Sequence, residues 1–152
     1  MILRRLARPL VAGIFVYGGW NALRLTEMHA EAAKPLLDKT LGESSPDPVN
    51  LVRADALVKI IAGTTFATGK LPRLSALALA GSLVPTTAAG HPFWEAKGED
   101  KQQQLTHFLK NAALLGGLLI AAADTEGRPS VGWRARRAAK VTSKAAREKL
   151  PS

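Results

Sequence analysis

The sequence has no cysteine, few aromatic residues and a shortage of acidic residues. Without cysteine, the chain has no disulfides, thiolate nucleophiles, cysteine zinc sites, iron–sulfur clusters or covalently attached c-type haem. Against 21 Lys and Arg there are only 12 Asp and Glu, which gives a formal net charge of +9 at pH 7. This excess predicts an anionic partner, and composition alone does not choose between lipid headgroups and nucleic acid. The length of 152 residues favours a single folded domain.

Charged residues are also missing from two long stretches. No Asp, Glu, Lys or Arg occurs in residues 9–23 or 74–94, and two further segments, 54–69 and 105–123, are apolar with a few charged positions. A helix needs roughly 20 mostly apolar residues to cross the hydrocarbon core of a bilayer. The sequence therefore predicts four transmembrane helices, and the alternative is a soluble protein in which the same segments are buried core helices. The predicted spans are about 6–24, 53–70, 72–92 and 105–123.

The placement of basic residues predicts an orientation, because cytoplasmic loops carry an excess of Lys and Arg. With four spans, the two ends of the chain and the short loop near residue 71 fall on one side. That side holds Arg4, Arg5, Arg8, Lys70, Arg73 and eight basic residues between Arg128 and Lys149. The opposite loops, 24–50 and 95–104, hold five basic residues against eight acidic ones. We therefore expect an all-α, antiparallel four-helix bundle, N-in and C-in, as a multi-pass protein of the bacterial cytoplasmic membrane.

Residues 1–125 form the predicted transmembrane domain, and residues 126–152 form a basic juxtamembrane tail on the cytoplasmic side. Each basic residue near an anionic membrane surface contributes about 1 kcal/mol to binding. The tail is expected to adhere to anionic lipid headgroups as an interfacial helix from Trp133 to about Leu150, and a solvated tail is the alternative. Nucleic acid is not an expected partner, because the basic residues are not interleaved with aromatic ones.

Two local features predict how the helices pack and connect. Small residues recur at spacings of four, which allows the close backbone approach that drives helix association in lipid. These positions include Gly63 with Ala67 and the row Ala113, Gly117 and Ala121, and the glycines Gly13, Gly18 and Gly19 make the first span thin in a similar way. In the loop after the first span, Thr26 is expected to be the N-cap of a short helix that continues through Lys34.

The polar residues of the spans share one depth, near the outer surface. Asp55 and Lys59 are one helical turn apart, where they can form an ion pair, and His107, Lys110 and Asn111 share one face of the fourth span. Two polar faces that avoid lipid are expected to face each other. The sequence thus predicts an outward-facing polar pocket. Its predicted lining residues are Asn21, Arg53, Asp55, Lys59, His91, His107, Lys110 and Asn111.

Two alternatives to a ligand pocket stay open. These side chains either extend to the membrane surface individually, or form a structural ion pair that holds the second and fourth spans together. A functional pocket with lysines suits an anionic or quinone-like, oxygen-rich ligand, and a histidine exchanges protons near neutral pH. Metal or haem ligation by His91 and His107 is not expected, because no further ligand signature accompanies them. No motif of a soluble-type active site occurs, so no catalytic residue is assigned.

Four segments resemble one family of membrane proteins. They are RRLARPLVAGIFVYGGWNALR, VRADALVKIIAG, LPRLSALALAGSLVPTTAAGHPFWE and QQQLTHFLKNAALLGGLL. Over about residues 3–125 the chain resembles the DoxX family of small bacterial four-helix membrane proteins. Some DoxX and DoxD relatives are subunits of quinone-linked sulfur oxidation, and mycobacterial relatives associate with redox and thiol-detoxification proteins.

The resemblance implies a membrane subunit of a quinone-linked redox complex, with a redox partner subunit and quinone as the ligand. The residues themselves show no cofactor. The alternative is a non-catalytic protein that uses the same cavity for small-molecule binding, transport or scaffolding. Since most family members have no established activity, the resemblance does not decide whether the protein is an enzyme.

Overall fold

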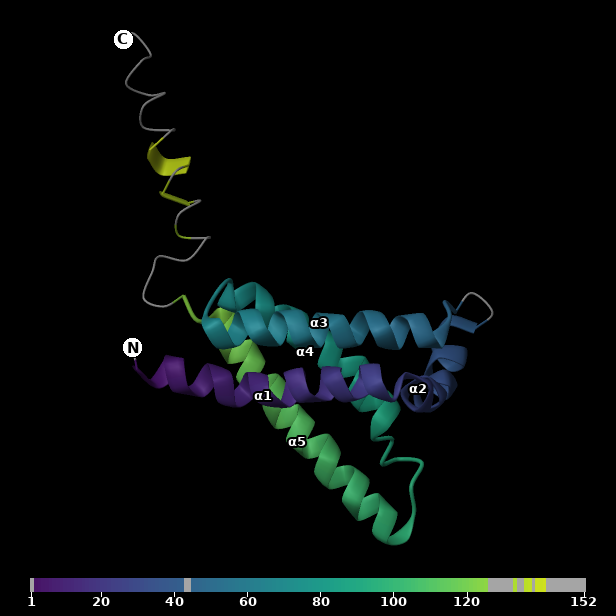
Figure 1. Cartoon of the computed structure of the whole chain (residues 1–152). Coiled ribbons are helices and arrows are strands. Elements are labelled where there is room, and N and C mark those ends of the chain that lie inside the picture. Colours follow the sequence, from purple (N-terminus) through teal and green to yellow (C-terminus); the bar gives the residue numbers. More distant parts are fainter. Residues whose placement is uncertain (1, 43–44, 126–132, 134–135, 138, 142–152) are drawn as a thin grey trace.

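The computed structural model describes residues 2–42, 45–125, 133, 136–137 and 139–141, and this part of the chain is helical without strands (Figure 1). The helices are α1 (Ile2–Arg24), α2 (Thr26–Leu41), α3 (Pro48–Thr68), α4 (Pro72–Gly90) and α5 (Gly98–Ala123). The all-α prediction is confirmed. Helices α1, α3, α4 and α5 overlap the four predicted spans, with α3 and α5 beginning five and seven residues earlier than predicted, and α2 occupies the loop between the first two. The predicted tail helix lies mostly outside the described residues, although the Arg137 guanidinium lies 5.0 Å from the centre of the Trp133 ring.

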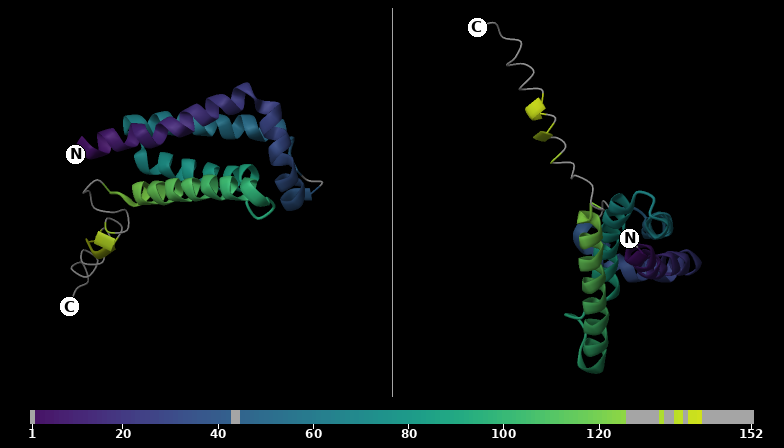
Figure 2. Two further views of the ribbon diagram at one scale, coloured as in Figure 1. Left: turned by 90° about the horizontal axis from the view of Figure 1, so that it is seen from below. Right: turned by 90° about the vertical axis from the view of Figure 1, so that its left-hand side faces the viewer.

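The four long helices form an array in which α1 packs on α3, α3 on α4 and α4 on α5. Helix α2 runs across one end of the array, in contact with α3 and α4 (Figure 2). Following the predicted orientation, we call this end, with the α4–α5 loop, the outer end. The inner end contains the N-terminus, the α3–α4 turn and the end of α5. Helix α5 meets α1 near the inner end and leans away from it toward the outer end (Figure 1).

Side-chain contacts hold the inner end together. Arg4 donates two hydrogen bonds to the Asp124 carboxylate, at 2.6 and 3.1 Å, which ties the start of α1 to the end of α5. Arg73 at the start of α4 donates to the backbone carbonyl oxygen of Ala122 at 2.7 Å. The Arg8 guanidinium lies beside Gly69 in the α3–α4 turn. These predicted inner-side arginines therefore join α1, α4 and α5 at one surface.

Local sequence determines where α3 begins and how it connects to α4. The Asp47 side chain accepts a hydrogen bond from the Val49 backbone N–H, and Pro48 occupies the first turn, as at many helix starts. Helix α3 ends at Gly69, whose φ of 74° is a left-handed conformation that glycine adopts at low cost. Pro72 begins α4 three residues later. The turn makes α3 and α4 antiparallel neighbours.

The prediction for the start of α2 was wrong. Leu25 is the N-cap residue and makes no side-chain capping bond, and α2 continues past Lys34 to Leu41. The Thr26 hydroxyl instead donates to the carbonyl oxygens of Ala22 and Leu23, at 3.0 and 2.9 Å. These carbonyls belong to the last turn of α1, which lacks helical partners of its own. Thr26 therefore closes the end of α1 rather than the start of α2.

The interior consists mainly of small side chains, whereas many large apolar side chains are exposed. In the described part of the chain, alanine supplies eight of the thirteen buried hydrophobic residues. Leu10 on α1 is 80% exposed and Ile120 on α5 is 75% exposed. A water-soluble helix bundle buries its large apolar side chains. The arrangement here suits a hydrocarbon environment, in which close backbone approach replaces water exclusion.

Glycine allows the closest of these approaches, between α1 and α3. A Cβ atom at Gly19 would lie 2.7 Å from the Ala56 carbonyl oxygen and 2.9 Å from Ile60 Cγ1. One at Gly63 would lie 2.8 Å from Val16 Cγ2. The predicted close packing is confirmed at these two positions. By contrast, apart from each glycine's chain neighbours and its own helix backbone, no described atom lies within 4 Å of the corresponding Cβ positions at Gly13, Gly18 and Gly117.

By length and composition, one helix in the described part of the chain qualifies as a membrane span, namely α5. Only 11% of its apolar window is buried, whereas the core helix of a soluble protein is mostly buried. Helix α3 contains Arg53, Asp55 and Lys59, and α4 is rich in Ser, Thr, Gly and Pro. These residues lower the mean hydropathy of both helices.

We predict that Gly19→Ala lowers the free energy of unfolding by about 1–3 kcal/mol, because the new methyl group overpacks against the backbone of α3. Gly18→Ala is the matched control, since it adds the same methyl group to open space and raises helix propensity by roughly 0.5–1 kcal/mol. Thermal unfolding of the two variants in detergent measures the difference. Equal stability of both variants would contradict close packing of α1 on α3.

Candidate functional site

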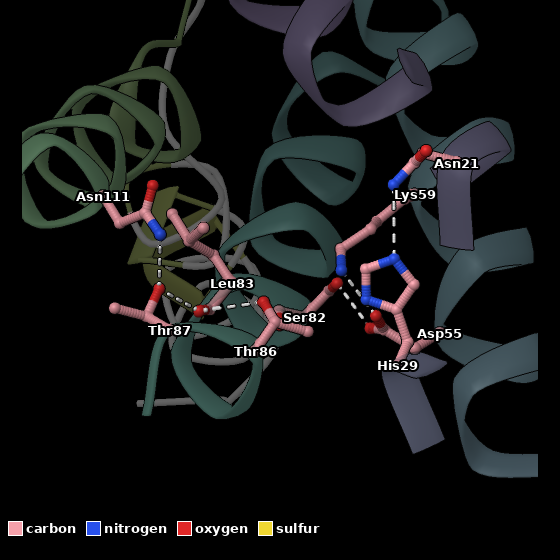
Figure 3. Close-up of polar contacts among 9 residues, drawn as sticks. All are labelled: Asn21, His29, Asp55, Lys59, Ser82, Leu83, Thr86, Thr87 and Asn111. Carbon is pink, nitrogen blue, oxygen red and sulfur yellow. Dashed lines mark hydrogen bonds and ion pairs between the residues drawn. The ribbon is translucent and has the colours of Figure 1, made fainter. Parts of the chain in front are cut away.

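The eight residues predicted to line one pocket lie in separate places. Asn21, Asp55 and Lys59 lie where α1, α2 and α3 meet, together with His29 of α2. His91, which directly follows α4, borders a cavity together with His107, Lys110 and Asn111 of α5. Arg53 lines another cavity, beside the start of α2. Asp55 and Asn111 lie on opposite sides of α4 (Figure 3).

The structure confirms that Asp55 and Lys59, one helical turn apart on α3, form an ion pair. Lys59 Nζ lies 2.6 Å from Asp55 Oδ2, and the two side chains are 13% and 26% exposed. The Ser82 hydroxyl of α4 donates a hydrogen bond of 2.5 Å to the other carboxylate oxygen. Since an ion in apolar surroundings is costly unless it is paired, these bonds fix the rotation of α3 against α4. The link joins α3 to α4, and not to α5 as the structural alternative supposed.

His29 adds a partner that the sequence analysis missed. The Asn21 side-chain nitrogen lies 3.2 Å from His29 Nε2, which joins α1 to α2 (Figure 3). Burial, and then the positive charge of Lys59, lower the pKa of His29 below its ordinary value. The neutral ring is therefore favoured, and its Nε2 accepts a hydrogen bond from the Asn21 side-chain N–H. The only feature of the sequence that pointed to His29 was its position about one turn after the start of the helix in the loop that follows the first span.

The second group is built around two stacked imidazole rings. The centres of the His91 and His107 rings are 4.9 Å apart with an angle of 12° between the planes. His91 Nδ1 lies 2.8 Å from Gln104 Oε1. Because that oxygen only accepts hydrogen bonds, His91 carries its proton on Nδ1 and leaves Nε2 as the basic nitrogen. Phe93, Trp94 and Phe108, which are close to the two histidines in the sequence, pack against one another.

Asn111 is held by a hydroxyl of α4 that the sequence analysis also missed. Its side-chain nitrogen donates to Thr87 Oγ1 at 3.1 Å, and the Thr87 hydroxyl donates to the Leu83 carbonyl oxygen at 2.6 Å (Figure 3). Thr87 and Ser82 thus give α4 one polar contact toward α5 and one toward α3. No signal in the sequence distinguished these two residues from the other hydroxyl residues of α4, Ser75 and Thr86.

A cavity of about 730 Å³ lies between α1 and α5, and we call it the α1–α5 groove. It exists because α5 leans away from α1 toward the outer end. His91, His107, Lys110 and Asn111 form its polar outer part. Its deeper walls are apolar and come from Val11, Ile14, Ala113, Leu114 and Gly117. The groove therefore has the shape and polarity to hold an amphiphilic molecule, with its polar group toward the outer surface.

Metal binding has little support in the residues that the structure describes. They contain no group of three or more His, Cys, Asp and Glu side chains placed to hold a metal ion. The two stacked histidines have Gln104 and Lys110 as neighbours, and a lysine ammonium is not a metal ligand.

Comparison with known proteins identifies the family. The model of the DoxX family matches residues 3–92. The chain belongs to the DoxX family. DoxX proteins are membrane proteins, so this protein is a membrane protein with a lipid environment. No curated protein and no solved structure matches the chain. The DoxX match covers α1 to α4 and His91 but not α5, so His107, Lys110 and Asn111 lie outside the matched region.

We predict that Asp55→Ala lowers the free energy of unfolding by about 1–3 kcal/mol, because it leaves the Lys59 ammonium without its anion in a mostly buried position. The double variant Asp55→Ala/Lys59→Met is expected to be less destabilised than the sum of its single changes, since it removes both charges. Unfolding of the four proteins in detergent gives the coupling free energy. Lys101→Met, on the exposed first turn of α5, is the control and should change stability by less than about 0.5 kcal/mol. Additive effects would show that the pair does not stabilise the fold.

Proposed function

We propose that α1, α3, α4 and α5 cross the bacterial cytoplasmic membrane, with both ends of the chain in the cytoplasm. The four helices contain 23, 21, 19 and 26 residues, which corresponds to lengths of roughly 28–39 Å. The hydrocarbon core is about 30 Å thick. Their exposed apolar side chains suit a lipid environment. The contacts of Arg4, Arg8 and Arg73 lie at the inner end, on the side that the distribution of basic residues predicts to be cytoplasmic.

Within this topology, we propose that the protein is the membrane subunit of a quinone-linked redox complex and binds quinone in the α1–α5 groove. The observation that carries the proposal is the polarity of that groove, with hydrogen-bonding groups at its outer part and apolar walls below. Lys110 and Asn111 have N–H donors for the oxygen atoms of a quinone ring. The side chains of Val11, Ile14 and Leu114 are suited to an isoprenoid tail.

The histidines give the groove a group for proton exchange. A bound quinone supplies two-electron, two-proton chemistry at its ring oxygens. Gln104 holds the Nδ1 side of His91, so Nε2 is the ring atom that would take up a proton at the outer surface and pass it to a quinone oxygen as the partner's electrons reduce the quinone. Stacked His107 packs against His91 and limits its rotation. We assign the supply of electrons to a partner subunit, because the chain has no cysteine for thiol or iron–sulfur chemistry.

The test is to purify the protein, extract any bound quinone and quantify it by mass spectrometry. We expect quinone to co-purify with the wild type, and the variant Lys110→Met/Asn111→Leu to retain at least about tenfold less, because lost charge-assisted and neutral hydrogen bonds cost roughly 1–3 kcal/mol each. Lys101→Met removes one positive charge from the same helix outside the groove and should leave the bound quinone unchanged.

A well-folded double variant that retains the wild-type amount of quinone would contradict the proposed site. Quinone-dependent electron transfer in native membranes, measured with wild type and the double variant, separates the redox role from the alternative. Bound quinone or another amphiphile without electron transfer would support a non-catalytic binding, transport or scaffold function instead.

A further inference from the structure

A second cavity, of about 480 Å³, lies where α1 turns into α2. We call it the corner pocket. Its charged residues are Arg24 of α1, Glu27 of α2 and Arg53 of α3, and the remaining lining residues are Leu23, Leu25, Thr26 and Met28. Both arginines are exposed, and neither forms an ion pair with another described residue. The pocket thus has a surplus of one positive charge and two guanidinium groups whose donors are available.

The start of α2 adds to the positive potential of the corner pocket. Thr26, Glu27 and Met28 form the first turn of α2, which follows the N-cap Leu25 and has no side-chain cap among the described residues. The Thr26 hydroxyl points back to carbonyl groups of α1. Free backbone N–H groups and the helix dipole make such a first turn favourable for an anion. Two arginines from different helices and this uncapped turn therefore line the same cavity.

An apolar surface continues from the pocket toward the middle of the bundle. Gly19 of α1 faces Ala56 of α3, and for antiparallel right-handed helices the residues that follow two facing positions lie on the same side. Trp20 and Leu57 therefore share one face of the α1–α3 pair, and they are 57% and 50% exposed. Arg24 and Arg53 lie one turn further out on this face. The face presents a tryptophan near the membrane surface, as is common in membrane proteins.

We propose that the corner pocket binds an anionic glycerophospholipid of the leaflet that contains α2. The phosphate diester accepts hydrogen bonds from Arg24 and Arg53, as guanidinium groups commonly bind phosphate, and the acyl chains lie against Trp20 and Leu57. Its single negative charge matches the surplus positive charge of the pocket. A free phosphate ion would gain nothing from the apolar face. No residue is shared with the α1–α5 groove, so this inference needs the membrane setting but not the quinone proposal.

Native mass spectrometry of the full-length protein in detergent, titrated with phosphatidylglycerol, tests the proposal. We expect one phosphatidylglycerol to be retained, with at least tenfold higher affinity than phosphatidylcholine. Arg24→Gln/Arg53→Gln should weaken this binding at least tenfold. Lys97→Gln/Lys101→Gln is the matched control, because it removes two exposed positive charges at the same end of the molecule, outside the corner pocket, and should keep wild-type binding.

Two further measurements decide the chemistry of the ligand. Glu27→Gln should bind phosphatidylglycerol more tightly than the wild type, since it removes a negative charge beside the phosphate. Millimolar inorganic phosphate should not displace the lipid. Equal losses in the arginine variant and its control, weaker binding by Glu27→Gln, or displacement by inorganic phosphate would each overturn the proposed lipid site. None of these results depends on whether quinone binds between α1 and α5.

Discussion

A charged side chain in an apolar helix must find a partner away from lipid, and this constraint positions α3. Lys59 meets it by pairing with Asp55, whose second oxygen accepts the Ser82 hydroxyl of α4. Once α3 is held in this rotation, Gly19 and Gly63 allow α1 to pack closely on its other side. Helix α5 packs on α4 rather than on α1. The groove between α1 and α5 follows from this order of packing.

The two ends of the molecule have different roles. At the inner end, arginines bond to Asp124 and to the Ala122 carbonyl, so the same basic residues that indicate the orientation also close the bundle. At the outer end, α2 lies across α3 and α4, and α5 leans away from α1. A ligand site at the outer end can therefore open beside a fixed inner end. The polar side chains that were predicted to line a pocket, and the charged linings of both cavities, lie on this outer half.

The sequence predicted the positions of the polar residues along the helix axes better than their positions around the bundle. Apolar stretches with few or no charged residues locate the long helices, because only such stretches are stable in the hydrocarbon core of a bilayer. The four-residue spacing predicted the Asp55–Lys59 pair. The spacing within one helix carries no information about which neighbour it faces, so the separation of Asp55 from Asn111 by α4 was not predictable. The role of Thr26 was missed because its hydroxyl bonds to helix α1, whereas capping rules consider only the helix that follows.

The central claim is that the inner and outer ends lie on opposite sides of the membrane. The absence of cysteine from the chain makes its topology directly measurable, because one introduced thiol is the only one present. Leu71 in the α3–α4 turn and Lys97 before α5 are both exposed, so each position accepts a cysteine. In spheroplasts, a membrane-impermeant maleimide is expected to label Lys97→Cys, and to label Leu71→Cys only after the membrane is permeabilised. Labelling of both variants in sealed spheroplasts, or of Leu71→Cys alone, would contradict the account.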